Sequence, residues 1–362
     1  MKKILALVVG GNQLLFAIQA KHTIHINDEF DIAYRNIDID EVAAKSIFDN
    51  VYRIKSNDGP SKSKALRCFL NPEYAVKKYY ANIDLGKYTD ILFWHPDWLH
   101  YFLYKYSCLK KHKYHWHLLP EGLGLYLIRG YNISSRKKYG RALLSPIVEL
   151  IDKIKYGYPE NASNIVEDAY FIQAKYALNN DNIKQVNLLP FDIADTEFIS
   201  LVNQILKYKH TIINDKIIIL DGGLEGSRKD YYNPEKMDKI IEFIANKYGR
   251  EKVLLKRKHD IPLTEYPKEL IEKVTDYPGN NMPWELICLN NDIKNSLIIS
   301  VPSSAVILPY IFSGFCNETY MIDYELLDVE LNEWLQSRYK EIYSRISFSQ
   351  PSYKLYDSSI LD

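Results

Sequence analysis

The order of hydrophobic and polar positions predicts short apolar strands that alternate with helices. The run Ile4–Val9 predicts the first strand, and Gln13–Ala20 predicts the helix that follows it. Further elements are predicted for the first half at Thr23–Ile26 (strand), Asp40–Phe48 (helix), Val51–Ile54 (strand), Lys64–Tyr80 (helix), Ile91–Trp94 (strand), from Pro96 (helix), Tyr114–Leu119 (strand), Ala142–Ile154 (helix) and Glu167–Phe171 (strand). Such alternation is typical of an α/β domain.

The alternation then starts again in the second half of the chain. The segment Val186–Ile193 and a predicted helix at Asp195–Tyr208 lead into it. The elements predicted there are Lys216–Leu220 (strand), a helix from Pro234, Lys252–Lys256 (strand), Lys268–Val274 (helix), Trp284–Leu289 (helix), Ser296–Val301 (strand) and Ala305–Phe312 (helix). A chain of 362 residues is long enough for two domains. We therefore expect two Rossmann-like domains, residues 1–190 and 191–362, facing each other across a cleft.

The composition of the chain indicates a globular protein and argues against a nucleic-acid binder. With 47% hydrophobic and 25% charged residues, the chain has the composition of a globular protein. Its 46 basic residues are balanced by 46 acidic ones, so no overall field favours nucleic acid, and we expect no nucleic-acid partner.

The cysteines and the first residues of the chain indicate its cellular compartment. The four cysteines lie far apart without metal-binding spacing, which predicts reduced, buried thiols in a cytosolic protein. The apolar run after Met1 is short and is interrupted by Gly10 and Gly11, which favours a β-strand over a signal peptide. No stretch approaches the roughly 20 apolar residues of a membrane span. We expect a cytoplasmic location.

The first candidate for chemistry is a carboxylate in a glycine-flanked turn. Glu121 follows the predicted strand Tyr114–Leu119, and open α/β sheets place ligands just past the carboxyl ends of their strands. Gly122 and Gly124 would let a substrate approach the backbone closely. Glu121 could accept a proton, and an apolar surrounding would raise its pKa. An acid beside glycine is also a common turn residue.

The second candidate is a histidine in a basic loop. His259 follows the predicted strand Lys252–Lys256 and can give or take a proton near neutral pH. Lys256, Arg257 and Lys258 beside it would favour a bound anion. Basic runs of this kind are also common on solvated surfaces.

Two further loops suit a phosphate. Ser303 and Ser304 open a predicted helix, whose first amides and hydroxyls can bind an anion, although serine there is also a common helix cap. Gly222 and Gly223 stand in a glycine-rich loop after the strand Lys216–Leu220. We expect these residues, with Lys256 and Lys258, to bind a donor.

The turn after the first strand is a candidate for the acceptor side. Gly11 and Asn12 form a tight strand-to-helix turn that leaves room for an acceptor ligand. The GxGxxG fingerprint of nicotinamide-binding proteins is absent, which argues against a redox enzyme.

Three histidines close together raise the question of a metal. On a strand, His115 and His117 share a face, while His112 lies before it, and we expect no acidic partner close to them. A metal site needs three or four converging ligands, so we expect a strand and no metal.

The order of these motifs resembles that of bacterial sialyltransferases of the two-domain GT-B type, especially the lipooligosaccharide sialyltransferase and capsule polysialyltransferase group. Glu121-Gly122 matches that group's acid-glycine motif, Lys258-His259 its histidine motif and Ser303-Ser304 its serine motif. The segments Val9–Leu15 and Met282–Leu286 are similar to the family's opening strand-helix and to its Pro-x-Glu segment.

Two positions depart from the family pattern. Pro120 stands where the family has a first acid, and Asp260 stands where it has a proline after the histidine. These departures indicate a divergent branch whose donor is sialic acid or another CMP-linked nonulosonic acid.

The resemblance implies a GT-B fold and an inverting transfer without a cofactor or metal. Glu121 would deprotonate the acceptor hydroxyl, and His259 would protonate or hydrogen-bond the departing CMP phosphate. The partners would be a nucleotide sugar and a cell-surface glycan, capsule or lipooligosaccharide.

The basic segment Ser134–Arg141 before the predicted helix Ala142–Ile154 is by default a solvated face. The alternative is a surface for an anionic acceptor or a lipid headgroup, with peripheral association with the inner membrane.

Two other functions stay open on the sequence. A GT-B glycosyltransferase could use a UDP- or GDP-linked hexose, because the fold does not fix the nucleotide. A non-catalytic scaffold that binds a nucleotide or sugar is the other interpretation, since Pro120 replaces one acid of the family motif.

Overall fold

The protein forms two compact units, which are considered separately. The structure, a computed structural model, describes residues 1–54, 67–68, 70–94, 98–120, 126, 154–155, 165–178, 183–221, 232–257, 262–278, 282–301, 303–315, 317–328, 333–349 and 353–356. Unit 1 contains Met1–Leu189 and Gln204–Lys207, and unit 2 contains Pro190–Asn203 and Tyr208–Asp362.

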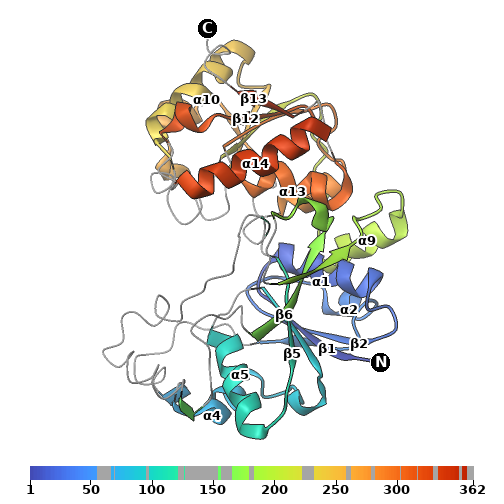
Figure 1. Cartoon of the computed structure of the whole chain (residues 1–362). Coiled ribbons are helices and arrows are strands. Elements are labelled where there is room, and N and C mark those ends of the chain that lie inside the picture. Colours follow the sequence, from blue (N-terminus) through green and yellow to red (C-terminus); the bar gives the residue numbers. More distant parts are fainter. Residues whose placement is uncertain are drawn as a thin grey trace. The chain divides into compact units, whose positions relative to one another are not determined.

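Unit 1 is built on a seven-stranded parallel sheet in the order β3-β2-β1-β4-β5-β6-β7 (Figure 1). Its strands are mostly buried, as expected of parallel strands with helices on both faces of the sheet. They are β1 (Lys3–Val8), β2 (Glu29–Tyr34), β3 (Val51–Arg53), β4 (Asp90–Phe93), β5 (His115–Leu118), β6 (Val166–Ile172) and β7 (Lys184–Leu188).

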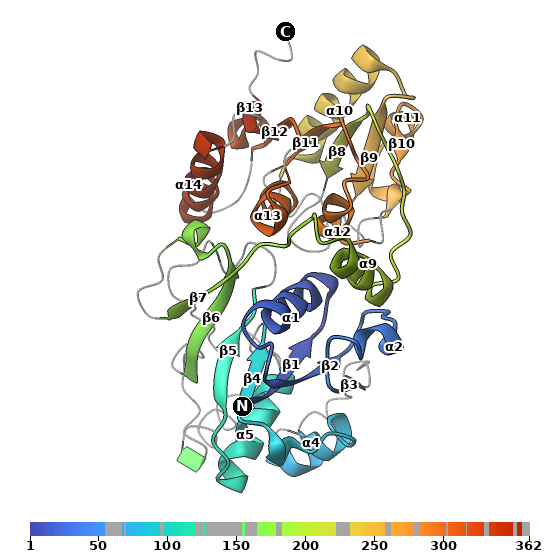
Figure 2. The same cartoon turned by 90° about the vertical axis from the view of Figure 1, so that its right-hand side faces the viewer.

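The helices of unit 1 cover the two faces of this sheet. α1 lies on one face, and the packed pair α4 and α5 lies on the other (Figures 1 and 2). The helical elements are α1 (Gly11–Thr23), α2 (Glu41–Ala44), α4 (Pro72–Tyr79), α5 (Trp98–Lys110) and the short 3-10 turns η1 (Leu85–Lys87) and η3 (Ala174–Tyr176). The helix α9 (Thr196–Ile205) follows β7.

Unit 2 repeats the arrangement on a six-stranded parallel sheet in the order β10-β9-β8-β11-β12-β13. The strands are β8 (Ile217–Asp221), β9 (Val253–Arg257), β10 (Thr275–Asp276), β11 (Leu297–Ser300), β12 (Thr319–Ile322) and β13 (Tyr353–Tyr356). Its helical elements are α10 (Pro234–Tyr248), α11 (Lys268–Ile271), α12 (Trp284–Leu289), α13 (Ser304–Ser313), α14 (Glu333–Ser349), η5 (Leu263–Glu265) and η6 (Tyr324–Leu327). α10 and α11 cover one face of the sheet, and α12, α13 and α14 cover the other (Figure 2).

The predicted fold class is confirmed. In each unit the first strand lies at the centre, and the chain first adds strands on one side and then crosses to the other, which is the Rossmann order 3-2-1-4-5-6. The two parallel α/β sheets are those expected of a GT-B protein. The division at residue 190 into an acceptor-side and a donor-binding domain, and the cleft between them, stay predictions.

The strand predicted at Thr23–Ile26 is wrong. α1 continues to Thr23, and the second strand is β2, at Glu29–Tyr34. Glu29 and Asp31 interrupt the apolar pattern of this strand in the sequence, and Asp31 is fully buried. Asp31 is tolerated there because Lys87 Nζ (2.7 Å) and Tyr88 Oη (2.6 Å) donate hydrogen bonds to its Oδ2.

The helix predicted over Lys64–Tyr80 is interrupted. Asn71 caps α4, its Oδ1 accepting a hydrogen bond from Tyr74 N (3.0 Å), and Pro72 occupies the first helical position. The helix predicted at Lys268–Val274 ends at Ile271, and β10 follows. The elements β12, α14 and β13 lie beyond the last element that the sequence pattern predicts.

Membrane-spanning helices and free cysteines are the features that bear on the expected location of the protein. Among the described residues, no helix combines the length and the apolar character that crossing a bilayer requires. Cys68 and Cys288 are buried free thiols as expected, whereas Cys108 is exposed on α5, contrary to the expectation of buried cysteines.

Candidate functional site

The predicted donor-binding residues belong to segments that start at neighbouring strand ends in unit 2. β9, β8 and β11 are adjacent in the sheet, with Lys256 opposite Leu220 and Ser300 on the other side of Leu220. The chain reverses its direction of strand addition between β8 and β11, and ligands of open α/β sheets bind at this point. Because β9, β8 and β11 are adjacent and parallel, the segments that follow them start at the same edge of the unit 2 sheet.

Lys256 is buried one residue before the end of β9. Its side chain is 8% exposed, and its Nζ lies 5.8 Å from the centre of the Tyr277 ring. Burial lowers the pKa of Lys256 to about 8, although the nearby charge of buried Glu285 in α12 opposes that shift. A bound phosphate would favour the charged form of this lysine. Arg257, the next residue, instead pairs with Asp276 through two contacts of 2.9 and 3.1 Å.

Ser303 stands at the N-cap position of α13 with an extended backbone (φ −148°) but does not cap the helix. Its side chain makes no capping hydrogen bond, and Ser304 begins the helix beside it. The first amides of a helix lack intrahelical partners and carry partial positive charge. The Ser303 hydroxyl is therefore not used as a cap, and it lies at the positive end of α13, which favours an anion.

This geometry gives a prediction for the serine motif. Ser303→Ala is expected to weaken CMP binding by roughly tenfold, since a hydrogen bond to a charged group contributes about 1.5–3 kcal/mol. The melting temperature should be nearly unchanged, because no capping bond is lost. Calorimetric titration and thermal unfolding measure the two effects.

Ser313→Ala is the matched control at the other end of the same helix. Ser313 Oγ donates to Pro309 O (3.1 Å), so its loss should lower stability and leave CMP binding intact. If Ser303→Ala instead lowers stability by about 1 kcal/mol without changing CMP affinity, Ser303 is a cap and not a ligand.

Several predicted site residues lie outside the described part of the chain. These are Glu121, Gly122, Gly124, Gly222, Gly223, Lys258 and His259. The strands that precede them are described: β5 ends at Leu118, β8 at Asp221 and β9 at Arg257. The roles of these residues stay predictions.

In unit 1, the structure places Gly11 and Asn12 in the first turn of α1, just after β1. Gln13 closes this turn, because its Oε1 accepts hydrogen bonds from Val9 N (2.6 Å) and Gly10 N (3.0 Å). Asn12 Oδ1 is buried and has no hydrogen-bond partner in the described part of the chain. The turn lies next to β4, where this sheet reverses its order, so Asn12 is suitably placed to contact an acceptor.

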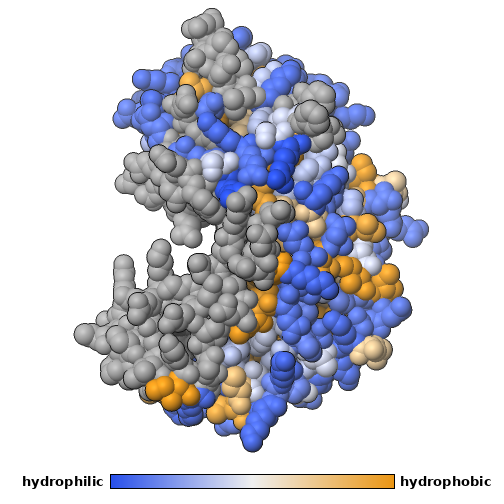
Figure 3. Space-filling view, viewed as in Figure 1, coloured by the Kyte–Doolittle hydropathy of each residue, from blue (hydrophilic) through white to orange (hydrophobic). Residues whose placement is uncertain are grey.

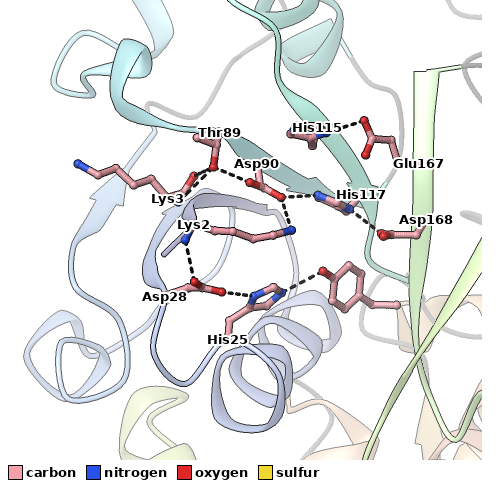
Figure 4. A network of polar contacts seen from close by, with 11 residues as sticks. Lys2, Lys3, His25, Asp28, Thr89, Asp90, His115, His117, Glu167 and Asp168 are labelled. Atoms are coloured by element: carbon pink, nitrogen blue, oxygen red, sulfur yellow. Dashed lines mark hydrogen bonds and ion pairs between the residues drawn. The ribbon is translucent and has the colours of Figure 1, made fainter.

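A polar network that the sequence pattern does not predict lies at the opposite, amino-terminal edge of the unit 1 sheet (Figure 4). His117 is 2% exposed and bridges two carboxylates, with Nε2 2.9 Å from Asp90 Oδ1 and Nδ1 2.5 Å from Asp168 Oδ1. Lys2 Nζ also donates to Asp90 Oδ1 (2.8 Å). The network links β4, β5 and β6 through side chains.

A second histidine extends this network. His25 Nδ1 lies 2.9 Å from Asp28 Oδ2, and its Nε2 lies 2.9 Å from the hydroxyl of Tyr170 (Figure 4). The Tyr170 ring in turn packs edge-on against His117, with 5.8 Å between the ring centres. Sequence spacing could not reveal these partners, since Asp90 and Asp168 are far from His117 in the chain.

The two buried histidines titrate in opposite directions. Burial is the largest effect on His117 and lowers its pKa, but hydrogen bonds to Asp168 and Asp90 outweigh it and raise the pKa above 6.5. For His25, burial dominates over the bond to Asp28 and lowers the pKa below 6.5. For Asp90, burial raises the pKa, but hydrogen bonds from His117, Lys2 and Thr89 bring it well below its usual range. The two carboxylates therefore favour the protonated form of His117.

The ring nitrogens of His117 and His25 are engaged by carboxylates and by the Tyr170 hydroxyl. Within the residues that the structure describes, no group of three or more His, Cys, Asp or Glu side chains could hold a metal ion. Both nitrogens of His117 are occupied by carboxylates, which leaves no lone pair for a metal.

The comparisons with known proteins concern the fold. Neither the family models nor the curated protein sequences include a match to this chain. Solved structures do match. One is the GT-B domain of a sialyltransferase from Photobacterium damselae, with 14% identity, a TM-score of 0.46, and coverage of 98% of this chain and 100% of that chain.

Two other similar structures are a glycotransferase and an epimerase. The glycotransferase of kitacinnamycin has 11% identity and a TM-score of 0.47, and the match covers 99% of this chain and 87% of that one. A UDP-GlcNAc 2-epimerase from Methanocaldococcus jannaschii has 12% identity and a TM-score of 0.41, with 98% and 88% coverage. At such identities and TM-scores, none of these likenesses carries an argument about the reaction of this chain.

Proposed function

We propose that the protein is an inverting, metal-independent glycosyltransferase that moves sialic acid or a related nonulosonic acid from a CMP-sugar to a cell-surface glycan. The observation that carries the proposal is the edge of the unit 2 sheet formed by the ends of β9, β8 and β11. Buried Lys256 lies there, and Ser303 opens α13 with a hydroxyl that does not cap the helix. These are groups suited to a nucleotide phosphate.

The motif resemblance supplies the donor. Glu121-Gly122, Lys258-His259 and Ser303-Ser304 occur in the order found in sialyltransferases of the GT-B type. They follow β5, β9 and β11 in the chain, which are positions where open α/β sheets bind ligands.

The proposed reaction is a single displacement. The acceptor hydroxyl oxygen forms a bond to the anomeric carbon of the donor while the bond from that carbon to the CMP phosphate oxygen breaks, which inverts the configuration. Glu121 takes the proton of the acceptor hydroxyl, and His259 donates a proton or a hydrogen bond to the departing phosphate. Lys256, Lys258 and the serines neutralise this phosphate, so the reaction requires no metal or other cofactor.

The proposed setting is the cytoplasmic face of the inner membrane. A CMP-sugar is made and used as a charged, water-soluble donor, and the acceptor is a capsule or lipooligosaccharide glycan under construction. Gly11, Asn12, Gly122 and Gly124 form the acceptor side in this proposal.

The experiment that tests the donor is thermal unfolding of the purified protein with CMP, UDP, GDP or NAD in the presence of EDTA. A ligand at about 100 times its dissociation constant stabilises the native state by about 2.7 kcal/mol, which is large enough to detect. We expect CMP to raise the melting temperature and the other three nucleotides to leave it unchanged.

Each alternative gives a different pattern. Stabilisation by UDP or GDP in place of CMP would keep a nucleotide-sugar site and refute the CMP-linked donor. Stabilisation by NAD would indicate a redox enzyme. If no nucleotide stabilises the protein, the proposed donor site is wrong.

A further inference from the structure

An exposed surface of unit 1 combines apolar and basic side chains. We call it the α4–α5 surface; it comprises exposed side chains of residues 67 and 70–77, the end of α5 through Lys113, and residues 154–155. Three large apolar side chains are exposed on it: Leu70 (52%), Leu109 (39%) and Ile154 (76%). In Figure 3, apolar atoms lie beside strongly hydrophilic ones at the lower left, where α4 and α5 are drawn in Figure 1.

The charges on this surface are mainly positive. Its exposed basic residues are Arg67, Lys77, Lys110, Lys111, Lys113 and Lys155. Between residues 67 and 113, the exposed acids of the described chain are Glu73 and Asp84. The whole chain has a formal charge of zero, so this excess is local.

Side-chain contacts join these residues into one surface. Lys110 Nζ at the end of α5 lies 2.6 Å from Glu73 Oε1 at the start of α4, which brings the segments of Leu70 and Leu109 together. The Arg67 guanidinium lies 4.2 Å from the centre of the Tyr74 ring, and Lys110 Nζ lies 5.7 Å from that of Tyr106.

Lys105 connects residues 154–155 with this surface. It is 1% exposed in α5, one turn before Leu109. Burial lowers its pKa to about 7, and the positive charge of Lys155 adds to this effect. Lys155 and its neighbour Ile154 therefore lie close to α5.

We infer that the α4–α5 surface docks unit 1 onto an anionic lipid membrane, with Leu70, Leu109 and Ile154 entering the headgroup region and the basic residues contacting lipid phosphates. Apolar side chains beside lysines and tyrosines favour a lipid interface over a soluble polyanion, which would gain nothing from the leucines. None of the residues of this surface belongs to the proposed transfer site, so docking and catalysis can be tested independently. It would hold the enzyme next to a membrane-bound acceptor.

The test is co-sedimentation of the full chain with vesicles of phosphatidylcholine, or of equal parts phosphatidylcholine and phosphatidylglycerol. We expect binding to the anionic vesicles only, and weaker binding in high salt. Lys77→Glu/Lys111→Glu/Lys113→Glu should weaken binding by about 100-fold, since each basic residue near an anionic surface contributes roughly fivefold. The matched control is Lys239→Glu/Lys247→Glu/Lys268→Glu, the same charge change on exposed positions of unit 2.

A second variant tests the apolar part. Leu70→Ser/Leu109→Ser keeps every charge and should also reduce binding to anionic vesicles, while thermal unfolding confirms that the fold is retained. The proposal is wrong if the wild-type protein does not bind anionic vesicles, or if the two lysine triple variants lose binding equally. It is also wrong if the leucine variant binds as the wild type does, because the surface then recognises polyanions in general.

Discussion

Asp90→Asn is expected to destabilise unit 1 by about 3–5 kcal/mol, the cost of removing one partner of a buried ion pair. Asp90 is 2% exposed and accepts hydrogen bonds from both His117 and Lys2. Without the charge of Asp90, His117 keeps the Asp168 carboxylate as a partner in a buried position. Denaturant unfolding, followed by a probe specific to unit 1, measures the loss.

The structure offers a control pair in β5 and β6 of the same sheet. His115 Nδ1 pairs with Glu167 Oε1 at 2.7 Å, but both side chains are about half exposed (49% and 47%). Exposed pairs contribute about 0–1 kcal/mol, so Glu167→Gln should change stability little. Equal losses in Asp90→Asn and Glu167→Gln would contradict the view that burial makes the His117 network important.

The same network predicts how stability depends on pH. The folded-state pKa of His117 is raised above 6.5, so its contribution to stability is fully present below pH 6.5 and is lost as pH rises through the folded pKa. His25 acts in the opposite sense, because its folded pKa is lowered: its contribution is present above pH 6.5 and is lost as pH falls through the folded pKa.

Comparison of two variants separates these effects. The difference in unfolding free energy between wild type and His117→Gln should shrink as pH rises above 6.5, whereas the difference for His25→Gln should shrink as pH falls below it. A His117→Gln difference that does not vary with pH would show that His117 is neutral in the folded protein.

Glu121→Gln and His259→Ala are each expected to lower turnover by about 10²–10⁴-fold, the usual contribution of one proton transfer. Both variants should still bind CMP, because the proposal assigns phosphate binding chiefly to the lysines and the serine motif. Initial rates with a CMP-linked nonulosonic acid, together with calorimetric CMP titration, measure turnover and binding separately.

The controls for this pair are Glu167→Gln and His115→Ala, the same residue types at the opposite edge of the unit 1 sheet. They should leave turnover intact. Full activity of Glu121→Gln would refute its role as base, and loss of CMP binding in His259→Ala would indicate that this histidine chiefly holds the donor. A protein that binds CMP but turns over no donor, even as wild type, would be a scaffold.

The sequence by itself determined the class of fold. Apolar runs such as Ile4–Val9 and Lys216–Leu220 predict buried parallel strands, because both faces of such a strand are covered by helices, and both strands are observed. Turn and cap chemistry is equally local. Gly10 and Gly11 predict the strand-to-helix turn, and in the structure Gly10 is the N-cap of α1.

Local sequence patterns did not predict the positions where a buried polar residue is stabilised by partners from distant parts of the chain. The strand β2 was missed because Asp31 interrupts its apolar pattern, although Lys87 and Tyr88 satisfy that buried carboxylate. His117 similarly lies in a strand because Asp90 and Asp168 approach it from two other strands. Burying a charge is favourable only with such partners, and they come from distant parts of the chain.

Part of the candidate site likewise follows from the sequence, and part of it follows only from the tertiary structure. The serine and histidine motifs could be found from residue order, because each lies next to a strand end that the apolar pattern marks. The tertiary structure decided that the Ser303 hydroxyl is not used as a cap and that Arg257 is engaged by Asp276. It also decided that Leu70 and Leu109 lie beside lysines on one surface, since only the packing of α4 against α5 brings them together.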